Sequence, residues 1–115
     1  MPTTYVNGTR QAYGVEKVST LTSSTGLTEA NYLQNVDIAG ASARQAQEVM
    51  ISVETGAIRY TVDGTTPTTT ATTGIGHLAQ PGDILVIAGY QNIKNFRAIN
   101  AVASNGAELR VTFYR

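Results

Sequence analysis

The sequence predicts an all-β protein, an antiparallel β-sandwich or jelly-roll-like barrel of about seven strands with an N-terminal arm. Three observations predict this class. Short apolar runs alternate with polar residues at a period of two, which is typical of strands with one face on a core. Turn residues separate the runs at intervals of about 8–12 residues. No stretch has the longer apolar period of an extended amphipathic helix.

The length sets the domain organisation. A chain of 115 residues and 12.2 kDa has room for one hydrophobic core. We therefore expect an N-terminal arm over residues 1–17 and a single β-sandwich domain over residues 18–115. The arm is mixed and polar without a sustained period. It is either a frayed terminus or a segment that orders against a neighbouring subunit.

The first half of the domain has weaker patterns. Residues 18–25 alternate and predict a short strand, and residues 28–33 predict one helical turn with their threonine as N-cap. Val36 and Ile38 alternate with the aspartate between them. Residues 43–48 favour helix by composition, but the β-branched run that follows indicates that a strand begins within them.

The clearest local pattern is a hairpin in the middle of the chain. Over residues 49–53 every second side chain is apolar, and after a short break the same alternation returns over residues 58–62. Gly56, in that break, suits a tight reversal. Gly64 then ends the second strand because it favours a turn. Pro67 has no backbone N–H to donate to a neighbouring strand, so it also opposes further pairing. We expect the two strands to pair with each other.

A threonine-rich loop follows. Residues 65–76 have no core character, and such a long loop in a compact domain favours a binding or contact role. Residues 80–83 contain Pro and Gly in a turn arrangement. The next run, residues 84–87, is apolar on both sides, which predicts a strand that is central or covered on both faces.

The C-terminal part predicts two further strands. Residues 91–95 are too polar for a strand and suit a short helical turn or bulge. Phe96 and Ile99 are expected core members of the strand that follows. The Asn-Gly pair at 105–106 is a strong short hairpin signal, because both residues accept positive φ. Residues 109–114 then alternate and predict a paired terminal strand.

Composition argues against several partners. The eight basic and eight acidic residues cancel, and neither sign forms a run, so nucleic-acid binding is not expected. No apolar run approaches the roughly 20 residues of a membrane span. The charged fraction, 14%, is below the roughly 25% of an average domain. We interpret this as a largely uncharged surface, part of which is covered by partners.

The first residues lack the basic and apolar regions of a signal peptide, so synthesis in a cytoplasm is expected. The absence of cysteine leaves no disulfide, thiolate metal site or cysteine nucleophile.

Candidate chemistry is sparse. His77 is the only histidine, and one imidazole without a thiolate cannot complete a usual zinc site. No serine lies in a nucleophile-elbow pattern, and no glycine-rich phosphate loop is present. Asp63 and Asp83 lie in predicted turns, where aspartate caps its own backbone. We therefore expect no enzyme activity, no metal and no cofactor, and His77 at a loop or strand start. A small hydrolase would need His77 beside a serine or carboxylate in a pocket.

One segment adds a resemblance. Residues Ile58 to Thr68 read I-R-Y-T-V-D-G-T-T-P-T. This resembles the I-R-Y-T-x-D-G-T-x-P-T pattern of small β-rich virion proteins of tailed bacteriophages. In those proteins a Gly-rich turn, an apolar strand, an Ile-x-x-Phe-x-Ile stretch and a V-T-Y-Y-like terminal strand follow. The corresponding residues here are 81–83, 84–87, 93–99 and 111–114. A related hairpin occurs in fibronectin-III-like accessory domains of chitobiases and other glycosidases, so the motif specifies a turn better than a function.

The resemblance implies a non-enzymatic capsid decoration (cement) protein in the virion, made in the host cytoplasm. Its partner would be the major capsid protein or another virion protein, and it would act as a homo-oligomer, with a trimer favoured. Alternatives are a neck or tail component, or a carbohydrate-binding β-sandwich module that stacks sugars on tyrosines such as Tyr90. From the arm and the threonine-rich loop we select candidate interface residues: Tyr5, Arg10, Tyr13, Thr66, Thr69, Thr72 and Ile75.

Overall fold

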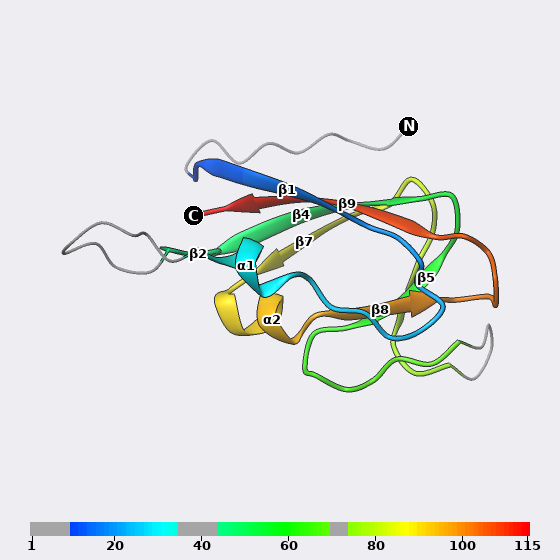
Figure 1. The fold of residues 1–115 in the computed structure, drawn as a ribbon. Helices are drawn as coiled ribbons and strands as arrows, with labels where there is room; N and C mark the ends of the chain where they lie inside the picture. The colour runs from blue at the N-terminus through cyan, green and yellow to red at the C-terminus, as the bar shows by residue number, and fades with distance from the viewer. Residues whose placement is uncertain (1–9, 35–43, 70–73) are drawn as a thin grey trace.

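A computed structural model of the chain describes residues 10–34, 44–69 and 74–115 (Figure 1). The predicted interface residues Tyr5 and Thr72 and the predicted alternation at Val36 and Ile38 lie outside these residues. The described elements, in chain order, are β1 (Ala12–Val18), α1 (Glu29–Tyr32), β2 (Leu33–Gln34), β3 (Arg44–Gln45), β4 (Glu48–Glu54), β5 (Ile58–Thr61), β6 (His77–Ala79), β7 (Ile84–Ala88), α2 (Tyr90–Asn95), β8 (Arg97–Asn100) and β9 (Glu108–Tyr114).

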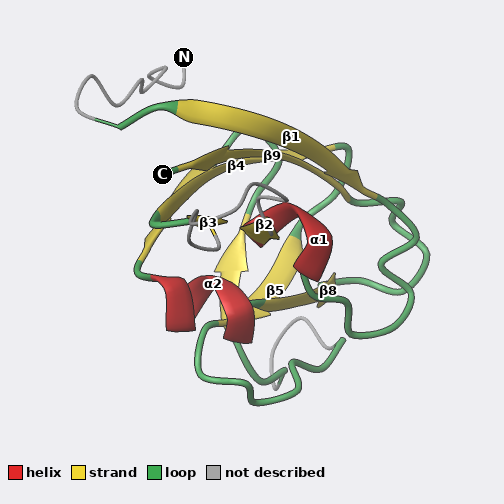
Figure 2. Cartoon of the chain, turned by 60° about the vertical axis from the view of Figure 1, so that its left-hand side comes forward, coloured by secondary structure: helices red, strands yellow, loops and turns green. Residues whose placement is uncertain are grey.

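The strands form antiparallel sheets, which confirms a β-rich fold. A four-stranded sheet has the order β1-β9-β4-β7, and a three-stranded sheet has the order β6-β5-β8. The short strands β2 and β3 pair with each other. The two larger sheets lie on opposite sides of a common core (Figure 2). Among the described residues, no helix is long and apolar enough to cross a membrane.

Alternation places the core as the sequence predicts. In β4 and β9 every second side chain points inward and is almost fully buried, because strand side chains alternate between faces. The inward residues of these two strands are Val49, Ile51, Val53, Leu109, Val111 and Phe113. Phe96 packs against them as predicted, whereas Ile99 is half-buried because it lies on the outer face of the three-stranded sheet, opposite Arg59. The terminal strand β9 is paired on both sides, with β1 and β4.

The predicted hairpin over residues 49–62 is wrong. Both strands exist, but β4 pairs with β7 and β9, whereas β5 pairs with β6 and β8. Residues 55–57 therefore carry the chain from one sheet to the other. Thr55 has φ +65°, and Gly56 is buried against Asn105. The local sequence suits a tight reversal, and it does not distinguish a hairpin turn from a crossing between layers.

The predicted hairpin at the Asn-Gly pair is wrong for the same reason. β8 and β9 belong to different sheets, so residues 101–107 form a second crossing. The two crossings lie against each other. The Thr55 hydroxyl donates to the Gly106 carbonyl, and Asn105 Nδ2 donates to the Ala57 carbonyl at 2.9 Å. We call residues 55–57 and 101–107 the corner pair.

The predicted strand over residues 18–25 and the arm boundary at residue 17 are also wrong. The strand is β1, and it ends at Val18, because Thr20 has φ +60° and cannot continue an extended run. The register of β1 against β9 shifts between Ala12 and Gly14. This bulge interrupts the alternation in sequence and hides the strand from a period-two reading. Residues 12–17 thus belong to the sheet.

The prediction that residues 84–87 form a strand that is central or covered on both faces is wrong. β7 is an edge strand of the four-stranded sheet. Leu85 and Ile87 face the core, whereas Val86 points outward and is 44% exposed. The apolar residues on both sides therefore reflect one core face and one partly open apolar face.

Three smaller predictions are confirmed. Residues 28–33 contain the short helix α1 with Thr28 as N-cap, and residues 91–95 lie in α2. Residues 80–83 form a turn in which the Asp83 amide donates to the Gln80 carbonyl at 3.0 Å. The two helices lie together at one end of the molecule (Figure 2), where the rings of Tyr32 and Tyr90 are 6.0 Å apart.

Candidate functional site

The threonine-rich loop between β5 and β6 is tied down at its base. Asp63 Oδ1 accepts a hydrogen bond from the Thr65 amide at 3.0 Å, and the Thr61 hydroxyl donates to the Thr65 carbonyl. These bonds follow from the Asp-Gly turn that the sequence predicts. The loop therefore leaves the end of β5 in a fixed direction.

The two arms of the loop are also joined. The Thr68 amide donates to the Ile75 carbonyl at 3.1 Å, and the Ile75 amide donates to Thr68 Oγ1 at 2.8 Å. Pro67 is fully buried, although the sequence predicts a loop without core character. Proline can be buried here because it has no amide hydrogen that would need a partner. The described part of the loop is thus anchored on the body of the protein.

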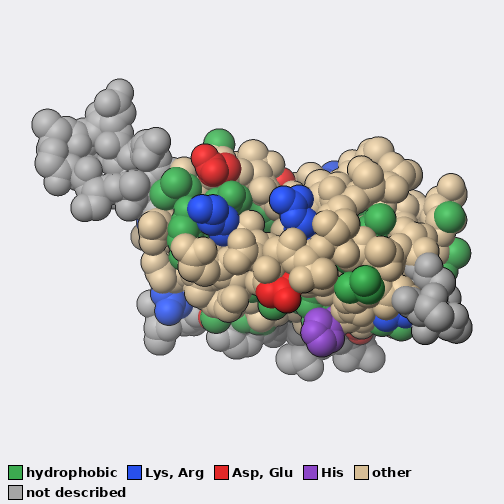
Figure 3. Space-filling model, turned by 90° about the horizontal axis from the view of Figure 1, so that it is seen from below, with side chains coloured by type: hydrophobic (Ala, Val, Ile, Leu, Met, Phe, Trp, Pro, Cys, Tyr) green, Lys and Arg blue, Asp and Glu red, His purple; other side chains and the backbone are tan. Residues whose placement is uncertain are grey.

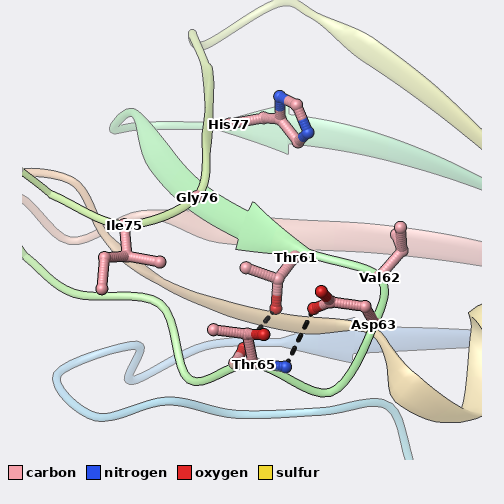
Figure 4. A pocket seen from close by; sticks show the side chains of 7 residues that line it. All are labelled: Thr61, Val62, Asp63, Thr65, Ile75, Gly76 and His77. Atoms are coloured by element: carbon pink, nitrogen blue, oxygen red, sulfur yellow. Dashed lines mark hydrogen bonds between the residues drawn. The ribbon is translucent and has the colours of Figure 1, made fainter.

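A shallow hollow of ≈ 290 Å³ lies where the loop returns to the sheet (Figure 4). Gly76 brings the returning chain close to β5, since a Cβ atom there would lie 3.0 Å from the Tyr60 carbonyl oxygen. Arg59 Nη1 also donates to the Gly76 carbonyl at 3.2 Å. The residues that line the hollow are Thr61, Val62, Asp63, Thr65, Ile75, Gly76 and His77.

The two titratable groups of the hollow point in different directions. His77 begins β6, as predicted, and is exposed, with its ring 5.4 Å from the Tyr60 ring. Figure 4 shows the imidazole pointing away from the Asp63 carboxylate. The hydrogen bond from the Thr65 amide lowers the pKa of Asp63, because it stabilises the ionised form. The Asp63 carboxylate is thus committed to the loop turn.

Metal ligands do not cluster in the described part of the chain. No group of three or more His, Cys, Asp or Glu side chains lies within reach of one ion there. Figure 3 shows one face of the molecule, on which basic and acidic side chains lie singly among uncharged atoms, near the purple His77.

The predicted interface residues that the structure describes fall into two groups. Thr66, Thr69 and Ile75 lie in the threonine-rich loop; Thr66 is exposed, Thr69 is half-buried and Ile75 is 52% exposed. Tyr13 lies in β1 of the other sheet, and Arg10 lies two residues ahead of that strand (Figure 1). The five predicted residues that the structure describes therefore lie in two separate parts of the molecule.

Tyr13 is used largely within the chain. Its hydroxyl donates to the Asn31 carbonyl at 2.8 Å, and its ring lies 6.2 Å from the Phe113 ring. The Arg115 guanidinium lies 5.0 Å from the ring centroid on top of it. Burial raises the pKa of the Tyr13 hydroxyl, and Arg115 opposes this shift. Little of the side chain is left for a partner.

Sequence reasoning missed Leu78, which is 46% exposed and lies on β6, three residues after Ile75. It points to the outer face of the three-stranded sheet, because it pairs with Arg59 in register. The short alternation of His77, Leu78 and Ala79 is the signal that could have found it. Leu78 on β6 and Ile75 in the loop are thus two exposed apolar side chains three residues apart in the sequence, and Ile75 lines the hollow. We call these two residues the apolar pair.

The described tyrosines do not form an exposed row for sugar stacking. Tyr32 and Tyr114 are buried, and Tyr13, Tyr60 and Tyr90 are half-buried. Tyr60 packs with its ring 6.0 Å from that of Phe96. The carbohydrate-binding alternative requires exposed tyrosine rings on which sugars can stack.

Comparison of the chain with protein-family models, with curated proteins and with solved structures gave no match.

Proposed function

We propose that the chain is a non-enzymatic structural protein of a tailed-bacteriophage virion, and that it decorates the head as a cement protein. The observation that carries the proposal is the segment from Ile58 to Thr68. Its sequence resembles that of small virion proteins, and here it forms β5 and the anchored base of the loop. The β-sandwich class of such proteins fits two antiparallel sheets around one core.

The proposed mechanism is binding through many small contacts. The anchored loop holds Ile75 at the surface and β6 holds Leu78 there, and apolar side chains of this kind stabilise an interface when a partner removes them from water. The partner is the major capsid protein, and the chain binds it as a homo-oligomer, with a trimer favoured. Many copies that each bind modestly would hold a shell together by multivalency.

The first experiment locates the protein. Mass spectrometry and immunogold labelling of particles from the phage or prophage that encodes the chain should detect it, with label over the head. Label confined to the neck or tail would favour the alternative virion position. Absence of the chain from purified particles would overturn the proposal.

The second experiment tests the apolar pair. Ile75→Asp should reduce occupancy of the particle by on the order of tenfold, because a charge would have to be desolvated at the interface. Val102→Asp is the matched control, since Val102 is 54% exposed and Ile75 is 52% exposed. Both variants should melt like the parent protein. Equal occupancy of the two variants would show that the loop is not the contact.

The residues ahead of β1 remain a candidate contact in this proposal. Because β1 begins at Ala12, a deletion that tests them has to stop before that residue. A variant beginning at Arg10 should keep the sheet and lose part of its capsid occupancy.

A further inference from the structure

We infer that Asn105 is a site of spontaneous deamidation that the corner pair keeps unreactive in the folded protein. Asn105 precedes Gly106, which is the sequence most open to this reaction, because glycine has no Cβ to obstruct its own amide nitrogen. A Cβ built on Gly106 would meet no atom within 4 Å. This inference is independent of the proposed function.

The folded corner holds both polar ends of the Asn105 side chain. Nδ2 donates to the Ala57 carbonyl at 2.9 Å, and Oδ1 accepts from the Ala107 amide at 3.1 Å. The backbone on each side is held as well. The Asn105 amide donates to the Val102 carbonyl at 3.2 Å, and the Gly106 carbonyl accepts from the Thr55 hydroxyl.

These contacts oppose the geometry that the reaction needs. The Gly106 nitrogen must attack Asn105 Cγ from above the plane of the side-chain amide. Two hydrogen bonds fix that plane, and Thr55 holds the Gly106 carbonyl, which lies in the peptide that follows the attacking nitrogen and limits rotation of Gly106. Reaction therefore requires local opening of the corner, and its rate follows the open population.

The chemistry needs water only. The Gly106 nitrogen loses its proton and forms a bond to Asn105 Cγ, and the Cγ–Nδ2 bond breaks with release of ammonia. Water then opens the cyclic imide at either carbonyl. One product is aspartate, and the other is isoaspartate, in which the side-chain methylene becomes part of the main chain.

Either product changes the corner. In aspartate, a carboxylate oxygen replaces the Nδ2 donor and faces the Ala57 carbonyl, so two acceptors oppose each other. Isoaspartate lengthens the main chain between β8 and β9. The reaction is therefore a one-way change that loosens the connection between the sheets.

The chain contains an internal reference for the experiment. Asn7 also precedes a glycine, Gly8. The full chain is incubated in mildly alkaline buffer, folded and in denaturant, and peptide mass spectrometry follows both sites. In denaturant the two sites should react at similar rates. In the folded protein Asn105 should react at least about tenfold more slowly than it does in denaturant, which corresponds to an opening free energy of about 1.4 kcal/mol or more. Equal rates for Asn105 in the two states would overturn the inference.

A pair of variants tests the role of the corner. Thr55→Val removes the hydroxyl that holds the Gly106 carbonyl, and it should raise the folded-state rate at Asn105 about fivefold, the factor for about 1 kcal/mol. Thr25→Val is the matched control, because it removes a hydroxyl bonded to the Ser23 carbonyl, away from the corner. It should leave the rate unchanged.

Circular dichroism verifies that each variant is folded. A folded Thr55→Val protein with the parent rate would refute protection by the corner. Should Thr55→Val fail to fold, the comparison of folded and denatured parent protein still decides the question. Asn105→Gln should abolish deamidation at this position in the folded and the denatured protein. Glutamine would have to close a six-membered cyclic imide, which forms far more slowly than the five-membered ring of asparagine.

Discussion

Glu16 shows at the residue scale how one side chain ties an edge strand to a helix. Its carboxylate accepts from the Thr28 amide at 3.2 Å, from the Thr28 hydroxyl at 2.7 Å and from Asn31 Nδ2 at 3.0 Å. Thr28 is the N-cap of α1 but makes no cap bond with its own side chain. Glu16 thus supplies the acceptor that the first turn of the helix lacks.

Replacing Glu16 with alanine should lower the free energy of unfolding by about 1–3 kcal/mol, because three donors lose a charged acceptor. Chemical denaturation with a circular dichroism readout measures the change. Glu29→Ala is the control: Glu29 lies exposed in the first turn of α1, and its loss should cost no more than about 0.5 kcal/mol. Equal losses for the two variants would show that the network does not hold the helix.

Asp63 gives a pH prediction. The amide of Thr65 lowers its pKa in the folded protein, so the folded state favours the ionised carboxylate. The resulting stability is complete above the unfolded pKa, near about 3.9, and is lost as the pH falls through the lower folded pKa. A carbon-detected NMR titration should give Asp63 a lower pKa than Asp in a denatured chain. The stability difference between the parent and Asp63→Asn should shrink on acidification through this range, and a constant difference would contradict the assignment.

At the scale of elements, the corner pair determines how the sheets connect. Gly56 is buried there, and a Cβ atom on it would lie 2.7 Å from Asn105 Cγ and 2.8 Å from the Asn105 carbonyl oxygen. Backbone cannot move aside as a flexible side chain can. The crossing between β4 and β5 therefore depends on the absence of a side chain at this position.

Gly56→Ala should destabilise the protein by about 1–3 kcal/mol through overpacking against Asn105. Gly14→Ala is a matched control, because a Cβ at Gly14 meets no atom within 4 Å and its φ is not positive. That variant should stay within about 0.5 kcal/mol of the parent. Thermal and denaturant unfolding measure both. A Gly56→Ala protein as stable as Gly14→Ala would mean that the corner adjusts without cost.

The elements also show what sequence could and could not predict. Alternation located β4, β5 and β9, because one buried face imposes a period of two on each strand. Alternation did not predict which strands these three pair with. Residues with positive φ serve a hairpin and a crossing alike, and in these two crossings they are Thr55, Ser104 and Gly106. Sheet membership is decided by long-range packing, which local turn chemistry does not contain.

The candidate site was predicted only in part. The threonine-rich loop and Ile75 were found because a long polar segment interrupts the strand pattern. Burial of Pro67, the bonds between Thr68 and Ile75, and the exposure of Leu78 were not predicted. Each depends on how the loop folds back on the three-stranded sheet, and sequence period carries no information about that.

At the scale of the whole molecule, β1 is part of the domain and not an appendage. A variant beginning at residue 19 would lose every β1 contact with β9, including the ion pair of 3.1 Å between Lys17 and Glu108. It would also expose β9 as a new edge. We expect it to aggregate or to lose its cooperative melting transition. A variant beginning at Arg10 should melt as the parent does, and size-exclusion chromatography with circular dichroism compares the two. If the variants beginning at residue 19 and at Arg10 melted alike, the predicted boundary between arm and domain at residue 17 would be correct after all.

The central position of β9 has a consequence during synthesis. β1 has no strand partner but β9 among the described strands, and residue 108 leaves the ribosome long after residue 18. At typical translation speeds the nascent β1 waits roughly 5–20 s. Throughout that time its apolar residues are open to chaperones and to neighbouring nascent chains on the same messenger RNA.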